Sequence, residues 1–217
     1  MLLYYITDRR QFPGDEPARR AALLKRITEA ARCGVSYVQL REKDLSGREL
    51  ETLARAVVCS VRENPPAGGG KSATQILINS RTDIAITCAA DGVHLTSTDV
   101  DPADVRSLWC GADAREVTVP TIAVSCHSAQ DVARAASAGA DLAVFAPIFE
   151  KRDAPDVRPV GLQALRDVCR QPIPVLALGA ITLENAPQCI HAGAAGIAAI
   201  RLFQQNDIAD VVRRLRG

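Results

Sequence analysis

Apolar residues in this chain collect in short runs, which are separated by longer stretches of mixed polarity. Four of the runs stand alone, and they are LLYYI (2–6), QILIN (75–79), TIAVS (121–125) and PVLAL (174–178). Four others end Ala-rich stretches, namely AARCGVSYVQL (30–40), AADGVHL (89–95), ASAGADLAVF (136–145) and HAGAAGIAAI (191–200). The runs are almost continuously apolar, which is typical of parallel strands that helices cover. The pattern therefore predicts eight buried parallel strands.

The stretches between the predicted strands have the character of helices. We expect helices at 17–32, 46–62, 128–138, 160–170, 183–191 and 206–215, and shorter ones near 82–89 and 102–108. A glycine precedes the strand in each Ala-rich stretch, and these glycines are Gly34, Gly92, Gly139 and Gly193. At each of them we expect the end of a helix and a positive φ.

Eight strand–helix units in 217 residues predict an α/β fold, a single (β/α)8 TIM barrel that takes up residues 1–217. An open doubly wound sheet is the competing fold. It would usually show fewer strands and a glycine-rich loop after the first one, where this chain has TDRRQFP. Residues 63–73, ENPPAGGGKSA, are expected to form a flexible insertion on the barrel face opposite the pocket.

Charge and composition narrow the classes of partner. The net charge of +1 argues against binding to nucleic acid or to a membrane surface, so any attraction for anions has to be local. The opening MLLYYITDRR is too short an apolar run for a signal peptide or a membrane span. Seven scattered cysteines without a C-x-x-C pair indicate reduced thiols. We therefore expect a cytoplasmic protein, and a homodimer stays open.

The chemistry of such barrels lies at the carboxyl ends of the strands. The second predicted strand ends in VQLREKD (38–44), which brings Gln39, Arg41 and Lys43 together. Two cations close together at a strand end suit an anionic ligand, although Lys43 could also be an ordinary solvated charge. Gln39 is expected to point into the barrel, where an unpaired amide is costly.

The ends of the seventh and eighth strands are the usual phosphate site of these barrels. Gly179, followed by a helix that Thr182 could cap, would let backbone N–H groups face a phosphate. Ile200 and Arg201 follow the eighth strand at the same rim. We therefore predict phosphate binding between Gly179 and the Ile200–Arg201 pair.

Three histidines have different predicted roles. His127 comes just after the fifth strand and could move protons near neutral pH, but it could equally cap the next helix or bond to a neighbouring loop. His94 lies inside a strand, and we expect it to be a packed side chain. His191 falls in the last turn of a helix, where a histidine interacts with the helix dipole.

Several segments together resemble the thiamine phosphate synthase/TenI superfamily. They are YYITD, VQLREKD, INSRTDIA, ADGVHL with the later Asp99, VSCHS, AGADLAVFAPIF, and LGAI with the tail AGAAGIA. The resemblance runs in order from residue 4 to about residue 203, and the segments around VQLREKD and INSRTDIA are its most specific parts. It implies a TIM barrel that acts in thiamine biosynthesis on a small phosphorylated thiazole.

The resemblance also implies roles for individual residues. A synthase of this superfamily, a thiamine-phosphate diphosphorylase, joins hydroxymethylpyrimidine diphosphate to thiazole phosphate with the help of Mg²⁺. Gln39, Arg41, Lys43 and Asn79 would hold the pyrimidine diphosphate, Ser125 would lie near its phosphates, Asp99 would bind the metal, and Gly179, Ile200 and Arg201 would hold the thiazole phosphate. Cations and a metal suit this reaction because negative charge develops on the departing diphosphate.

Departures from the synthase pattern change the expected reaction. Ser80 stands where synthases have a metal-binding aspartate, residues 150–159 lack the Thr-x-Thr-Lys pattern, Ala180 replaces a glycine, and Arg201 replaces a serine. Mg²⁺ binding by Asp99 should then be weak. TenI-type tautomerases share the barrel and need no cofactor, and their proton transfer would fall to His127. We therefore expect a TenI-like thiazole tautomerase. A divergent synthase and a non-catalytic sensor of phosphorylated ligands are the alternatives.

Overall fold

Eight parallel strands pair in the order of the chain, and the last pairs with the first, so that the sheet closes into a barrel. The computed structural model describes residues 1–66, 74–112, 119–150 and 157–217. The strands are β1 (Leu2–Ile6), β2 (Tyr37–Leu40), β3 (Gln75–Asn79), β4 (Gly92–Leu95), β5 (Thr121–Cys126), β6 (Leu142–Phe145), β7 (Val175–Leu178) and β8 (Gly196–Ala199). The predicted (β/α)8 barrel and its eight strands are confirmed.

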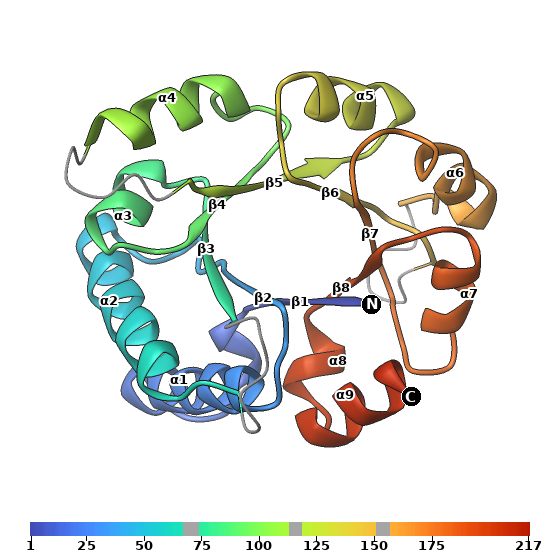
Figure 1. Ribbon diagram of the computed structural model, residues 1–217. Helices are drawn as coiled ribbons and strands as arrows, with labels where there is room; N and C mark the ends of the chain where they lie inside the picture. The colour runs from blue at the N-terminus through green and yellow to red at the C-terminus, as the bar shows by residue number, and fades with distance from the viewer. Residues whose placement is uncertain (67–73, 113–118, 151–156) are drawn as a thin grey trace.

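Helices surround the closed sheet on its outside (Figure 1). They are α1 (Glu16–Arg32), α2 (Gly47–Glu63), α3 (Thr82–Thr87), α4 (Pro102–Ala112), α5 (Ala129–Ser137), α6 (Gly161–Val168), α7 (Ala186–His191), α8 (Arg201–Gln204) and α9 (Ile208–Arg216). A 3₁₀ turn, η1 (Arg9–Gln11), follows β1. The turns η1 and α8 were not predicted, because so few residues cannot show a helical period.

Each strand buries both of its faces, in two separate layers. Tyr4 and Ile6 of β1 belong to the cluster that fills the barrel, whereas Leu3 and Tyr5 pack in the layer between barrel and helices. Successive side chains of a strand point to opposite sides. A strand that is covered on both sides therefore reads as a continuous apolar run, which is why the strands were visible in the sequence.

The glycines before the strands have two different structural reasons. Gly34, Gly139 and Gly193 have positive φ, as predicted. At Gly92 that prediction was wrong, since this residue begins β4 and the positive φ belongs to Ala89. Glycine is needed there for space, because a Cβ would lie 1.9 Å from the carbonyl oxygen of Thr121 on β5.

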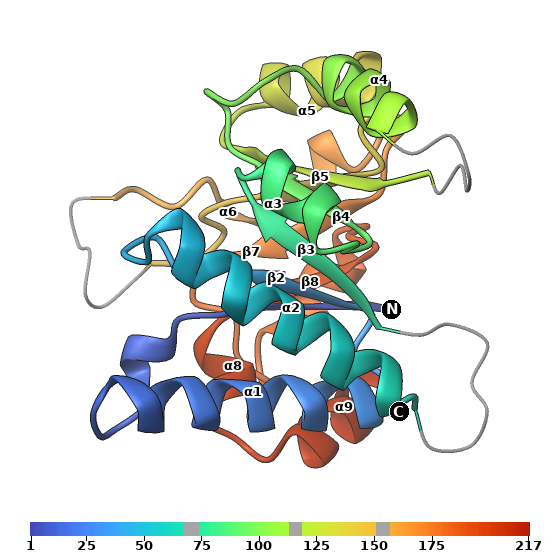
Figure 2. The ribbon, with the colours of Figure 1, turned by 90° about the vertical axis from the view of Figure 1, so that its left-hand side faces the viewer.

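Neighbouring helices contact one another around the barrel, for example α1 with α2 and α2 with α3. Figure 2 shows α1 beside α9 on one side and α4 beside α5 on the opposite one. Of the helices in the described ranges, none is long and apolar enough to cross a membrane. The predicted insertion at 63–73 falls between the end of α2 and the start of β3, and its residues 67–73 lie outside the described residues.

Candidate active site

A line of polar side chains crosses the carboxyl ends of β2, β3 and β4. Nε2 of Gln39 donates to Oδ1 of Asn79 (3.0 Å), and Nδ2 of Asn79 donates to Oγ of Ser80 (3.0 Å). Oγ of Ser80 in turn donates to Oδ2 of Asp99 (2.8 Å), which also accepts from the backbone N–H of Thr96 (2.6 Å). The structure therefore joins Gln39, Asn79, Ser80 and Asp99 in one network, as adjacent strand ends allow.

Gln39 keeps one hydrogen-bonding atom unused. Its side chain is buried, and Oε1 has no hydrogen-bond partner among the described residues. Gln39 pairs in register with Ile6 and Leu77, both of the cluster inside the barrel. A buried acceptor without a partner costs about 1–3 kcal/mol. An N–H group of a ligand would remove this cost.

His94 lies inside the barrel between two hydroxyl groups. Its Nδ1 lies 2.8 Å from the hydroxyl of Tyr4, and its Nε2 lies 2.8 Å from Oγ of Ser125. Burial, helped by the nearby positive charge of Arg41, lowers the pKa of His94 to about 3. The imidazole is therefore neutral, and it donates to one hydroxyl and accepts from the other. The prediction of a packed histidine is confirmed, and its contact with Ser125 had no sequence signal.

His127 stands between β5 and α5 with one ring nitrogen engaged. Its Nδ1 lies 3.0 Å from the carbonyl oxygen of Ala146, and its backbone N–H donates to Asp131. Because a carbonyl only accepts, Nδ1 carries the proton of the neutral ring and Nε2 is the basic nitrogen. Nothing in the described part of the chain bonds to Nε2. The contact with a neighbouring loop thus exists and leaves the other nitrogen available.

A cavity of about 880 Å³ opens at the ends of β7 and β8. Gly179, Ile200 and Arg201, which were predicted to hold a phosphate, all line it. Asp8 and Phe149 line it as well. Asp8 comes two residues after the end of β1, so its place near a strand end was a usable signal, whereas Phe149 had none.

The backbone at Gly179 comes very close to the loop after β6. Gly179 has a φ of +115°, and a Cβ there would lie 2.8 Å from Cα of Pro147 and 2.9 Å from N of Ile148. Only glycine fits this contact. Pro147 follows Ala146, whose carbonyl holds His127. His127 is thereby attached to the same loop that packs against Gly179 at the edge of the cavity.

The helix after Gly179 begins later than predicted. Asn185 is the residue before α7, and Thr182 bonds to it twice: the Thr182 N–H donates to Asn185 Oδ1 (2.8 Å), and Thr182 Oγ1 accepts from the Asn185 N–H (3.3 Å). These reciprocal bonds are those of a capping box, and the Ala186 N–H also donates to the carbonyl oxygen of Thr182 (3.0 Å). The predicted cap at Thr182 is therefore present, one turn before the residue at which α7 begins. Residues 180–185 of this turn line the cavity.

The charged residues after β2 differ in exposure and in their partners. Arg41 is partly exposed and Lys43 is exposed, whereas Glu42 is 4% exposed. Glu42 and Asp44 both bond to Arg9, which is itself buried. The two acids of the segment thus bond to Arg9, and the two cations that alternate with them do not. Arg9 was missed in the sequence, where it reads as one of two surface arginines after β1.

The residues around Asp99 do not fit a strong Mg²⁺ site. The described residues contain no group of three or more His, Cys, Asp or Glu side chains that could hold a metal. Oδ2 of Asp99 already accepts two hydrogen bonds, one of them from the uncharged Ser80. Mg²⁺ is usually held by one or two carboxylates together with substrate phosphates. Asp99 alone is therefore a weak ligand set.

Comparisons with known proteins agree with this arrangement. The family model described as "Thiamine monophosphate synthase", TMP-TENI, matches residues 3–203. A protein of Aquifex aeolicus named "Putative thiamine-phosphate synthase 2" is 37% identical over 93% of this chain and 96% of its own. The "Thiamine-phosphate synthase" of a Roseiflexus species is 32% identical over 92% and 76%. The solved thiamine phosphate pyrophosphorylase of Pyrococcus furiosus has a TM-score of 0.77 and 26% identity, over 99% of this chain and 93% of that one. The chain therefore belongs to the TMP-TENI family, as its sequence motifs indicated.

Proposed function

We propose that this enzyme of thiamine biosynthesis is a TenI-like thiazole tautomerase, which moves a proton between two positions of a carboxylated thiazole phosphate. The observation that carries the proposal is the hydrogen bond from Ser80 Oγ to Asp99 Oδ2 (2.8 Å). Synthases have a carboxylate in place of this hydroxyl. The hydroxyl brings no charge to a metal and occupies an oxygen that the metal would need. Departure of a diphosphate depends on such charge neutralisation, whereas a proton shift on a ring does not.

The two anionic groups of the substrate match two parts of the site. The phosphate binds in the cavity between Gly179 and Arg201, which residues 180–185 of the turn also line. The carboxylate binds to Arg41 and Lys43 across the barrel mouth. Gln39 accepts a hydrogen bond through its unused Oε1. These contacts fix the ring between the ends of β2 and β7.

His127 carries the proton in this proposal. Its Nδ1 is held by the carbonyl of Ala146, so Nε2 is the nitrogen that can take a proton from one ring position and return it to the other. Ser125 contacts the substrate beside it and is oriented by its bond to His94. The transfer needs a proton acceptor at Nε2 of His127, and no metal takes part.

The test measures both reactions on one preparation. We expect tautomerisation of the carboxylated thiazole phosphate and slow or absent coupling of pyrimidine diphosphate to thiazole phosphate. His127→Asn should lower tautomerisation at least about 100-fold, because a positioned proton carrier typically contributes 10²–10⁴-fold, while thiazole phosphate binding stays unchanged. His191→Asn, on the outer helix α7, is the matched control. Turnover of neither substrate would favour the non-catalytic sensor instead.

A divergent synthase is the second candidate, and the names of the relatives favour it. Gln39, Arg41, Lys43 and Asn79 are also all retained. Ser80→Asp decides between the two. Ser80 has a φ of +60°, a conformation that Asp adopts more readily than most residues, so the backbone can accept the change. If only Ser80→Asp gains Mg²⁺-dependent coupling, the result supports the tautomerase. If the unmodified protein couples the two substrates efficiently, it is a synthase.

A further inference from the structure

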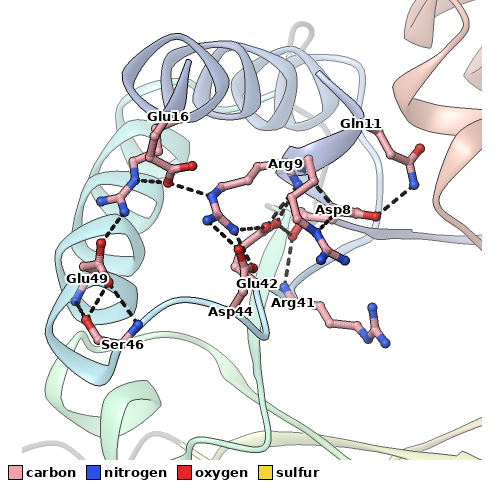
Figure 3. A network of polar contacts seen from close by, with 12 residues as sticks. Asp8, Arg9, Gln11, Glu16, Arg41, Glu42, Asp44, Ser46 and Glu49 are labelled. Carbon is pink, nitrogen blue, oxygen red and sulfur yellow. Dashed lines mark hydrogen bonds and ion pairs between the residues drawn. The ribbon is translucent and has the colours of Figure 1, made fainter. Parts of the chain in front are cut away.

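One buried arginine connects three acidic side chains beneath the mouth of the barrel (Figure 3). Arg9 Nη1 and Nη2 donate to the two carboxylate oxygens of Asp44 (2.8 and 2.9 Å), and Nη1 also donates to Glu42 (3.1 Å). Its Nε donates to Glu16 of α1 (2.8 Å). Arg9 is 4% exposed and Glu42 is buried with it, whereas Glu16 and Asp44 reach the surface, so the network extends from the interior to the solvent. It ties the turn after β1 to the segment after β2.

Thr7 links this network to the backbone of Arg41. Thr7 Oγ1 donates to Oε1 of Glu42 (2.6 Å) and accepts from the N–H of Arg41 (2.9 Å). The backbone N–H of Arg9 donates to both carboxylate oxygens of Glu42 (3.2 and 3.0 Å). Thr7 is completely buried. One hydroxyl thus fixes the peptide from which the Arg41 side chain starts.

The same contacts determine the direction of the Arg41 side chain. Arg9 binds the side chains of Glu42 and Asp44, and Figure 3 shows Arg41 directed away from Arg9 on the other side of the segment. Asp44 is fully ionised in this network, since its hydrogen bonds to Arg9 lower its pKa to about 2. If the acids were released, the segment could rotate, and the acids would compete for Arg41.

We infer that Thr7, Arg9 and Glu42 are positioning residues, which hold the 41–44 segment so that Arg41 presents its charge to an anionic group of the substrate. The inference rests on the proposed function in one respect, because that proposal gives Arg41 an anionic partner. None of the three residues lines the cavity at β7 and β8, and neither does Arg41. The tests therefore have to separate an effect that passes through Arg41 from one that does not.

The first test changes the Thr7 hydroxyl alone. Thr7→Val keeps the shape of the side chain but removes both hydrogen bonds, and Thr7→Ser retains them. Affinity for inorganic diphosphate, measured by calorimetry, should fall about tenfold in Thr7→Val, since one hydrogen bond to a charged group is worth roughly a factor of ten. It should stay within about twofold of the unmodified value in Thr7→Ser. Equal affinity of both variants would overturn the inference.

The second test asks whether the effect passes through Arg41. Glu42→Gln is combined with Arg41→Met, which also shows how much diphosphate binds elsewhere. A positioning role predicts a loss in Glu42→Gln alone and no further loss in the Arg41→Met background, because coupled residues are not additive. Equal losses in both backgrounds would show a merely structural effect and refute the inference.

Glu49→Gln is the control for the outer part of the network. Glu49 bonds to Arg20 and caps α2 at the surface, away from Arg41, so diphosphate affinity should not change. The proposed function and this inference fail separately. Absence of turnover would reject the tautomerase. The diphosphate affinities of the Glu42→Gln and Arg41→Met variants would still measure the positioning effect. If the unmodified protein does not bind diphosphate, Arg41 forms no anion site, and this inference is wrong.

Discussion

The surroundings of His94 decide its chemistry more than its residue type does. An exposed histidine changes charge near neutral pH, but this one is enclosed by the barrel and held between Tyr4 and Ser125. Its charged form would be buried without a carboxylate bonded to it, which is costly. His94 therefore acts as a fixed neutral link that orients Ser125, and it differs in this respect from His127, whose Nε2 is open.

This difference predicts a specific loss of stability in acid. The pKa of His94 is depressed in the folded protein, so between about pH 6.5 and its folded value the unfolded chain binds one more proton, and stability falls as the pH falls. From about pH 7.5 to about pH 5.5 this one group should remove about 1.4 kcal/mol of unfolding free energy. Urea denaturation of the unmodified protein and of His94→Gln at both pH values measures the difference.

The comparison with His94→Gln separates the pH dependence that His94 causes from that of the buried carboxyl groups. The pKa values of Glu42 and Asp91 are raised by burial, so these two groups favour the folded state as the pH falls, which is the opposite sign. They are present in both proteins and cancel in the difference. Equal pH dependence of the two proteins would mean that His94 can be protonated in the folded barrel.

The sequence predicts side chains at strand ends well and buried ion pairs poorly. Gln39, Asn79 and Asp99 could be placed because the barrel brings all carboxyl ends of its strands to one face. Glu42 and Arg9 could not, since a charged residue next to others reads as solvated. Their burial depends on a contact between two loops that are 33 residues apart, which local patterns do not contain.

The turn between β7 and α7 illustrates how one residue holds two neighbouring units together. Gly179 lies against Pro147 and Ile148 after β6, and the N–H of Ile148 donates to Leu178 (2.9 Å). This contact fixes the loop from which His127 is held and also one wall of the large cavity. We therefore expect Gly179 to matter for ligand binding and for stability together.

Gly179→Ala tests this expectation against Gly139→Ala. Both glycines have positive φ, so alanine should cost about 1–2 kcal/mol of stability at Gly139 and more at Gly179, where overlap adds to the strain. A Cβ at Gly139 would meet nothing within 4 Å, whereas at Gly179 it would overlap the backbone of residues 147–148. Only Gly179→Ala should then also lose at least tenfold in affinity for thiazole phosphate, roughly the effect of a 1.4 kcal/mol change. Similar losses in the two variants would place the phosphate elsewhere.

The boundaries of helices were harder to predict than their existence. The sequence indicated a helix from residue 183, but α7 begins at Ala186, one turn after Thr182, which forms the capping bonds with Asn185. Gly92 shows the same limit, since a glycine required by a neighbouring strand and one required by φ look identical in a sequence. The Gly92 case depends on a contact between two strands, whereas the bonds between Thr182 and Asn185 are local.

Closure of the barrel makes the first and last strands neighbours. Leu2 to Tyr5 of β1 pair with Gly196 to Ala199 of β8. A Cβ at Gly196 would lie 2.0 Å from the carbonyl oxygen of Leu2, so this junction accepts only glycine. Because each strand pairs with two others, no edge is left at which half of the barrel could separate. A substitution that destabilises the β1–β8 junction should therefore also destabilise the opposite side of the barrel.

The aromatic residues allow a direct test of this cooperativity. The single tryptophan, Trp109, is buried on α4, whereas the three tyrosines lie in β1 and β2, and Figure 1 shows these elements on different sides of the barrel. Tryptophan fluorescence and tyrosine circular dichroism should report one coincident urea transition, as for a two-state domain. Gly196→Ala should lower the unfolding free energy by about 3 kcal/mol, typical of severe overpacking, and should shift both signals equally. If the tyrosine signal shifted alone, the two sides of the barrel would unfold as separate units, and closure between β1 and β8 would not support α4.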